Sequence, residues 1–241
     1  MKIPTSIELI SELLNRCPGC GRSATSFCAR CWFILNHDEN GSLATRLVVV
    51  DRSPFVSRAL YVWRDGQAPF AGHSNIVRNA ILASKGSANR EVYRTFAEEM
   101  FRRSVGEDLW RERRDWVFIV PPSVRYLARD HAMELASQLS GLTGSSLPGR
   151  SVFEPGSAGL RQQKIKSRKD RELKQFSLSR SLGQAAKNRL LGASGFLFLD
   201  DVIASGATAK AAWSALGKPT RFEAWSIAWR GLPGQGGLDR Q

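Results

Sequence analysis

The sequence has no long uninterrupted hydrophobic run. No run approaches the ~20 apolar residues that a membrane-spanning helix requires. The amino-terminal stretch 5–14 is interrupted by Glu8 and Glu12, whereas a secretory signal has a continuous apolar core. The 42% of hydrophobic and 24% of charged residues are typical of a folded globular chain and exclude wholesale disorder. We therefore expect a cytoplasmic protein without a membrane span.

Acidic residues are scarce relative to basic ones. The chain has 22 Asp and Glu against 35 Lys and Arg, which leaves a net charge of +13. Residues 161–190 alone contain ten basic residues and two acidic ones. A run of charge can be an ordinary solvated surface. The excess over the whole chain nevertheless favours an anionic partner: nucleic acid, a membrane surface or a phosphorylated small molecule.

Cysteine is also rare, and the four cysteines fall within fifteen residues. They form two CxxC pairs separated by seven residues: Cys17, Cys20, Cys28 and Cys31. Each pair can wrap a tight turn around one side of a metal, and four thiolates complete a tetrahedral zinc site. A closed four-cysteine site leaves no open position for catalysis. The spacing therefore predicts a structural Zn²⁺ knuckle that folds with its metal.

The sequence also allows other roles for these cysteines. Disulfides fit poorly with a chain that has no export signal, and redox chemistry needs a CxxC at a strand-to-helix turn. An iron–sulfur cluster can also use four cysteines. His37 is a further candidate ligand, although four thiolates already complete the coordination shell.

Apolar strands alternate with helices after residue 44, which predicts an α/β fold with a parallel sheet. We expect three parts: an amino-terminal helix and zinc knuckle (1–44), the main domain (45–232) and a flexible tail (233–241). Period-2 and apolar runs predict strands, and 3.6-residue spacing predicts helices. The expected strands are 45–51, 57–64, 116–120, 195–199 and 222–229. The expected helices are 5–14, 74–85, 90–103, 124–139 and 208–216.

The most informative segment is 195–216, where an apolar strand leads to Asp200 and Asp201 and then to small residues. A loop of small residues lets backbone N–H groups approach a phosphate, and a following helix contributes the positive end of its dipole. Two carboxylates at the end of a parallel strand are placed to accept hydrogen bonds from ribose hydroxyls. The alternative is that Thr208 is a plain N-cap and the carboxylates are solvated. No Gly-Lys-Ser/Thr follows, so the segment is not a Walker loop.

The segment Asp200-Asp-Val-Ile-Ala-Ser-Gly-Ala-Thr208 resembles the phosphoribosyl pyrophosphate (PRPP) signature of type I phosphoribosyltransferases. With a four-cysteine knuckle amino-terminal to it, the chain is similar to the ComF family of competence proteins. Weaker similarities are a helix ending at Lys85, the motif at 120–122 and the helix that begins near Asp130. The resemblance covers about 200 residues. It implies a Rossmann-like type I phosphoribosyltransferase core preceded by the zinc knuckle.

The resemblance also implies roles for individual residues. Asp200 and Asp201 would hold the ribose at the catalytic position, and Mg²⁺ would accompany PRPP. The 5′-phosphate would bind residues 204–208, with Lys85 near the pyrophosphate; the loop residues are Ala204, Ser205, Gly206, Ala207 and Thr208. A basic flexible loop would contact pyrophosphate or nucleic acid through Lys164, Lys166, Arg168 and Arg171. The family commonly has Thr where this chain has Ala204, which cannot act as a base or donate a side-chain hydrogen bond.

Two functions of different classes follow. The first is a ComF-like factor in DNA uptake and natural transformation, which handles single-stranded DNA on the cytoplasmic side and binds PRPP or a ribose phosphate. Such a factor would work with a DNA-uptake or helicase partner protein. The second is an active phosphoribosyltransferase that transfers phosphoribose from PRPP to a nitrogenous acceptor. A third option is a scaffold whose knuckle docks a partner. The +13 charge and the substitution at Ala204 favour DNA handling.

Overall fold

We analysed a computed structural model of the chain. It describes nine segments of the chain: 16–24, 27–37, 47–52, 54–63, 71–84, 90–105, 108–122, 130–155 and 175–230. The predicted helix 5–14 and tail 233–241 lie outside them.

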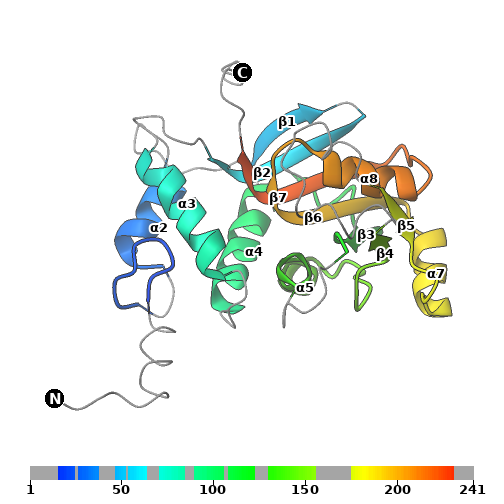
Figure 1. Cartoon of the computed structure of the whole chain (residues 1–241), viewed down its shortest axis with the longest axis horizontal. Helices are drawn as coiled ribbons and strands as arrows, with labels where there is room; N and C mark the ends of the chain where they lie inside the picture. The colour runs from blue at the N-terminus through cyan, green and yellow to red at the C-terminus, as the bar shows by residue number, and fades with distance from the viewer. Residues whose placement is uncertain are drawn as a thin grey trace, which may run out of the picture.

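A five-stranded, mostly parallel sheet forms the centre of the molecule (Figure 1). β2, β7, β6 and β3 run parallel, and β1 pairs antiparallel with β2 at one edge. Beyond β3, Ser146 continues the sheet, since Phe118 N donates to Ser146 O at 2.9 Å. In spatial order the strands are β1 (Val48–Arg52), β2 (Phe55–Trp63), β7 (Phe222–Arg230), β6 (Gly195–Ile203) and β3 (Trp116–Ile119). The predicted α/β fold with a mainly parallel sheet is confirmed.

Helices cover both faces of the sheet. One face packs against α3 (Ala71–Ser84), α4 (Arg90–Val105) and α5 (His131–Thr143). The other packs against α7 (Gln184–Leu191), α8 (Ala207–Ala215) and the two-stranded sheet of β4 (Phe153–Pro155) and β5 (Phe176–Leu178). Among the described residues, no helix is long and apolar enough to cross a membrane.

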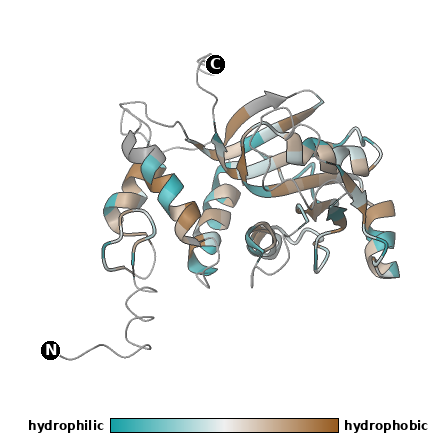
Figure 2. Ribbon diagram, viewed as in Figure 1, coloured by the Kyte–Doolittle hydropathy of each residue, from teal (hydrophilic) through white to brown (hydrophobic). Residues whose placement is uncertain are grey.

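The central strands are apolar on both sides, as strands covered on two faces must be. In β6, Leu197 and Leu199 enter the core beneath α4 and α5, whereas Phe196 and Phe198 enter the core beneath α8. Figure 2 shows this hydrophobic composition along β6 and the neighbouring strands. Eight of the nine residues of β7 are buried, from Phe222 to Trp229. The unbroken apolar runs in the sequence therefore correspond to interior strands.

The side on which the chain adds its next strand to the sheet reverses between β3 and β6. β3 is followed by α5 on one face and continues outward to Ser146, whereas β6 is followed by α8 on the other face and continues to β7. The two following helices therefore lie on opposite faces of the sheet at the carboxyl ends of β3 and β6. In open α/β sheets this switch point is the usual position of a ligand site.

The knuckle packs directly on the main domain. Its helix α2 (Ala29–Asn36) contributes Leu35 to the same core as the sheet, and the rings of Phe27 and Phe96 meet at 5.5 Å. Asn79 Nδ2 of α3 donates to Gly19 O at 3.2 Å. Hydrophobic contact and hydrogen bonding therefore join the four-cysteine segment to the helices that cover the sheet.

Several boundaries differ from the prediction. α5 begins at His131, because Asp130 is extended and its carboxylate caps the helix by accepting from Met133 N at 3.1 Å. Residues 124–129 of the predicted helix lie outside the described part of the chain. α5 continues to Thr143, where Gly144 adopts a left-handed φ of 70°. β6 is longer than expected and includes both aspartates, so they lie on the strand itself. Sequence analysis did not predict α2, α7, β4 or β5; the predicted basic loop 161–190 contains β5 and most of α7.

Candidate functional site

The four cysteines form a compact cluster. Their Sγ atoms all lie within 4.8 Å of one another, and the Sγ atoms of Cys20 and Cys28 are 3.7 Å apart. None of the four forms a disulfide. A tetrahedral zinc ion with Zn–S bonds of about 2.3 Å requires S···S separations of about 3.8 Å. The donor set could therefore hold a tetrahedral metal ion such as zinc.

Local backbone geometry brings the first pair together. Cys17 N donates to Arg22 O at 2.6 Å, and Gly21 N donates to Cys17 O at 2.8 Å, which closes a tight turn around Cys20. Gly21 has a φ of 75°, a left-handed conformation that glycine adopts without a steric penalty. The glycine after the first CxxC is thus required by the turn.

The second pair lies at the amino terminus of α2. Cys28 is the N-cap of the helix and Cys31 lies in its first turn, where the positive end of the dipole favours thiolates. The Cys31 backbone N–H lowers the pKa of the Cys28 thiol to about 7, and Cys28 N donates to Cys17 Sγ at 3.3 Å. Burial raises the pKa of Cys31 above its usual value. A bound cation would stabilise the buried Cys31 thiolate, as a metal site requires.

The second candidate site lies at the carboxyl end of β6. Asp200 and Asp201 are both half-buried there, and Asp201 N donates to Asp200 Oδ1 at 2.9 Å. Both residues have further interactions within the protein. The strand thus holds two acidic side chains in succession near its carboxyl end, at the switch point of the sheet.

A three-residue loop connects β6 to α8. Gly206 is the N-cap of α8 and has a φ of 75°, so the helix begins at Ala207 rather than at the predicted Thr208. Ala207 N donates to Ser205 Oγ at 3.3 Å, and Lys210 N donates to Gly206 O at 2.9 Å. Thr208 therefore lies in the first turn of α8 and is not its N-cap. The amino terminus of α8 follows Asp201 in the chain after five residues, and its role as a phosphate loop stays a prediction.

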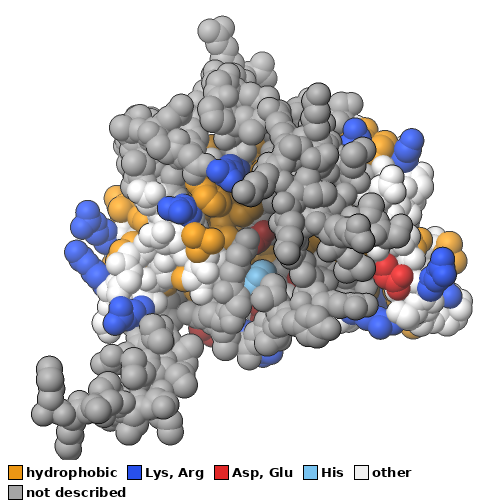
Figure 3. Space-filling model, viewed as in Figure 1, with side chains coloured by type: hydrophobic (Ala, Val, Ile, Leu, Met, Phe, Trp, Pro, Cys, Tyr) orange, Lys and Arg blue, Asp and Glu red, His pale blue; other side chains and the backbone are white. Residues whose placement is uncertain are grey.

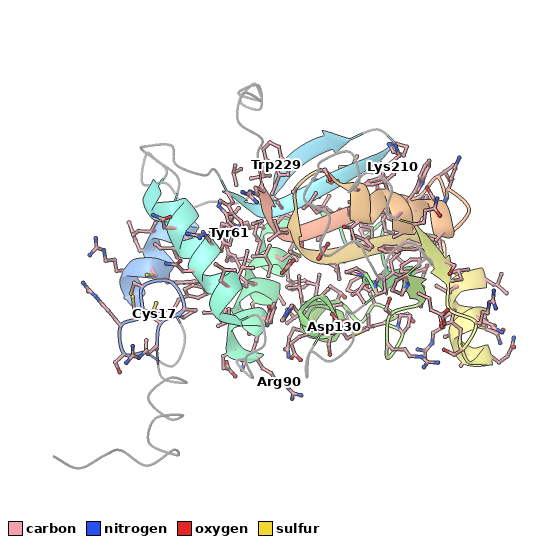
Figure 4. The ribbon with its side chains drawn as sticks, viewed as in Figure 1. Cys17, Tyr61, Arg90, Asp130, Lys210 and Trp229 are labelled. Carbon is pink, nitrogen blue, oxygen red and sulfur yellow. The ribbon has the colours of Figure 1, made fainter. Side chains whose placement is uncertain are left out.

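Asp130 is a third acidic residue near the switch point, and the sequence placed it only in a weakly similar helix. It lies at the amino terminus of α5, beneath β6 (Figure 4). Burial raises the pKa of Asp130, and the negative charge of nearby Asp201 raises it further. The motif Asp130-His131-Ala132 after the strand of 116–119 was the available signal. The switch-point topology is what brings Asp130 and Asp201 together.

The metal cluster and the acidic residues at the switch point are separate sites. Cys17 and Asp130 lie in different parts of the molecule (Figure 4). The remaining predicted site residues lie outside the described part of the chain: Lys85, Lys164, Lys166, Arg168 and Arg171. Their placement stays a prediction.

Comparison of the chain with models of known protein families and with curated proteins finds no match. The resemblance to ComF proteins therefore rests on the motifs themselves. The structure supports their coarser content: a mainly parallel α/β fold and a four-cysteine cluster near the amino terminus.

Proposed function

We propose that the protein binds PRPP or a related ribose phosphate at the carboxyl ends of β3 and β6. One observation carries this proposal: the paired aspartates of β6 lead through a small-residue loop to the start of α8 at the switch point of the sheet. The resemblance to the PRPP signature covers the same residues, 200–208. The metal cluster, which is closed by four thiolates, would have a structural role in this protein.

In this proposal each part of the site meets one part of the ligand. The N–H groups at the start of α8, with Ser205 and Thr208, would bind the 5′-phosphate. Asp200 and Asp201 would accept hydrogen bonds from the ribose hydroxyls. Mg²⁺ would neutralise the pyrophosphate when it is bound. Because the backbone provides much of the phosphate binding, alanine at position 204 is compatible with binding.

A second candidate function is the handling of single-stranded DNA in DNA uptake, as in the ComF family. The net charge of +13 favours it, because excess basic charge draws nucleic acid through the release of counterions. In that role the ribose-phosphate site would be regulatory. In an active transferase, by contrast, the same site would turn PRPP over in the presence of a nitrogenous acceptor.

The ribose-phosphate proposal predicts a large effect of Asp201→Asn on PRPP affinity. Loss of a charged hydrogen-bond partner should weaken binding by about 1.5–3 kcal/mol. Gly206→Val should weaken it more, because a β-branched residue is strained at a φ of 75° and crowds the backbone donors. Isothermal titration of PRPP with Mg²⁺ measures both effects.

Asp115→Asn is the matched control for this titration. Asp115 is exposed and immediately precedes β3. It therefore lies at the amino end of that strand, whereas the proposed site lies at the carboxyl ends of β3 and β6. Its substitution should leave PRPP binding unchanged. If the unaltered protein gives no heat with PRPP and Mg²⁺ at millimolar concentration, the ribose-phosphate proposal fails.

For DNA handling, we expect the basic loop to contact phosphates without reading sequence. Each phosphate contact to single-stranded DNA contributes about 0.7 to the slope of log affinity against log salt. Changing all four basic residues, Lys164, Lys166, Arg168 and Arg171, to glutamine should therefore reduce the slope by about three. Fluorescence anisotropy with labelled oligodeoxythymidine measures the slope. An unchanged slope would show that these four side chains do not contact the DNA.

A further inference from the structure

The described residues of the knuckle, α2 and α3 include arginines but no carboxylates. Residues 16–37 and 71–84 contain no Asp, Glu or Lys. Figure 3 shows basic side chains over α2, α3 and the knuckle, with hydrophobic side chains between them. We call this surface the basic knuckle face; its exposed members are Arg16, Arg22, Arg30, Arg78 and Phe33.

The knuckle and α3 form one continuous surface here. Arg16 and Ser23 pair across the knuckle turn, which places Arg22 beside this pair. Asn79 of α3 donates to Gly19 O in the same turn, and Arg78 precedes it as an exposed residue of the same helix. The arginines therefore come from three segments that the metal cluster and the packing of α3 hold together.

These arginines differ from those on the neighbouring helix. On α4, Arg94 pairs with Glu98 at 2.9 Å, and Arg102 pairs with Glu99. Within the part of the chain that the structure describes, the ion pairs include none of the four arginines of the basic knuckle face. Their charge is available to an anion from outside.

The metal site accounts for only part of this charge. A zinc ion with four thiolates carries a net charge of −2. Four arginines contribute +4, which leaves +2 on the surface. Arginine is also the side chain best suited to phosphate, because its planar guanidinium presents paired donors.

An exposed aromatic ring lies on the same side of α2 as Arg30. Phe33 is 56% exposed, and its ring stacks on that of His37 at 3.9 Å with an interplanar angle of 19°. His37 Nδ1 donates to Phe33 O at 2.8 Å, which holds the pair in place. Arg30, Phe33 and His37 follow i, i+3 and i+7 spacing and so share one side of α2. A rigid ring beside arginines is the arrangement on which unpaired nucleobases stack.

We propose that the basic knuckle face binds single-stranded nucleic acid, with its arginines on phosphates and Phe33 against a base. The inference extends the proposed DNA handling and adds a contact surface remote from the basic loop. A single exposed ring is enough for a nucleobase to stack on, whereas insertion into an anionic membrane uses the whole apolar face of a helix. Contacts from arginine to phosphate carry no sequence information, so we expect binding without sequence preference.

The test is fluorescence anisotropy with a labelled oligodeoxythymidine of about 20 nucleotides, enough to span more than one contact surface. The variant Arg22→Gln/Arg30→Gln should lower the slope of log affinity against log salt by about 1.4, from two lost phosphate contacts. Phe33→Leu should weaken binding about tenfold and leave the slope unchanged, because stacking is not a charge interaction. Metal content is measured for every variant, and it should remain at one ion per chain.

Arg94→Gln is the matched control, since Arg94 is an exposed arginine that is already paired on α4. It should bind the oligonucleotide as the unaltered protein does. The inference is overturned if the knuckle variants bind normally while the loop variant at 164, 166, 168 and 171 loses binding. It is also overturned if the knuckle variants lose only their binding to vesicles containing phosphatidylserine. If the unaltered protein does not bind the oligonucleotide at all, the proposed DNA handling itself fails.

Discussion

Replacing Cys28 by serine is expected to release the metal and destabilise the α/β domain as well as the knuckle. Structural zinc sites contribute about 10–16 kcal/mol of apparent binding free energy that is linked to folding. Phe27 and Leu35 pack in or against the core that also contains Phe96 and Leu60. Burial of such side chains contributes about 1.5–3 kcal/mol each, so loss of the knuckle removes about 3 kcal/mol or more from the main domain. For a chain of this size, that lowers Tm by roughly 6–12 °C.

Metal analysis and calorimetry measure the two parts of this prediction. The unaltered protein should contain one zinc ion per chain and unfold in a single transition, and a chelator should reproduce the effect of Cys28→Ser. Ser23→Ala is the control, because Ser23 is exposed in the same knuckle and offers no ligand. Iron–sulfur absorbance would contradict the zinc assignment. Two well-separated thermal transitions would contradict the shared core.

The sequence predicted those elements that local pattern determines. Apolar runs identified the strands at 116–119, 195–203 and 222–230, because strands covered on both faces are hydrophobic throughout. The two CxxC pairs predicted the cysteine cluster, because each pair needs only a short turn. The paired aspartates were found because they interrupt an apolar strand at its end.

Other features depend on tertiary contacts that have no local signal. α2 contains Trp32, Phe33 and Ile34 in succession, so its pattern does not distinguish a helix from a strand. α7 has no buried residue and hence little apolar periodicity. The position of Asp130 beside Asp201 follows from the order of β3 and β6 in the sheet, which the sequence does not state.

The junction between the knuckle and the sheet contains a buried ion pair. Glu99 and Arg103 of α4 are each only 3% exposed, and Arg103 Nε donates to Glu99 Oε1 at 2.7 Å. Arg103 also donates to Leu60 O of β2 at 2.9 Å and to Leu35 O of α2 at 3.4 Å. One guanidinium therefore joins the helix of the knuckle, α4 and an inner strand. Its orientation depends on the carboxylate of Glu99.

Glu99→Leu is expected to destabilise the protein by about 3–5 kcal/mol, because it leaves the guanidinium of Arg103 buried without a counter-charge. The same helix provides the control: Glu98 and Arg94 form a pair with the same i,i+4 spacing at 2.9 Å, but they are 49% and 57% exposed. Glu98→Leu should change stability by no more than about 1 kcal/mol, the range for exposed ion pairs. Urea unfolding measures both.

The double variant Glu99→Leu/Arg103→Met separates the charge from the packing. If the cost of Glu99→Leu is the unpaired charge, removing Arg103 as well should restore part of the lost stability, since a buried ion pair can be replaced by apolar side chains at small net cost. Recovery should be incomplete, because Leu60 O and Leu35 O would lose their buried donor. Equal losses in Glu98→Leu and Glu99→Leu would instead show that burial of the pair is irrelevant, and that the knuckle does not depend on it.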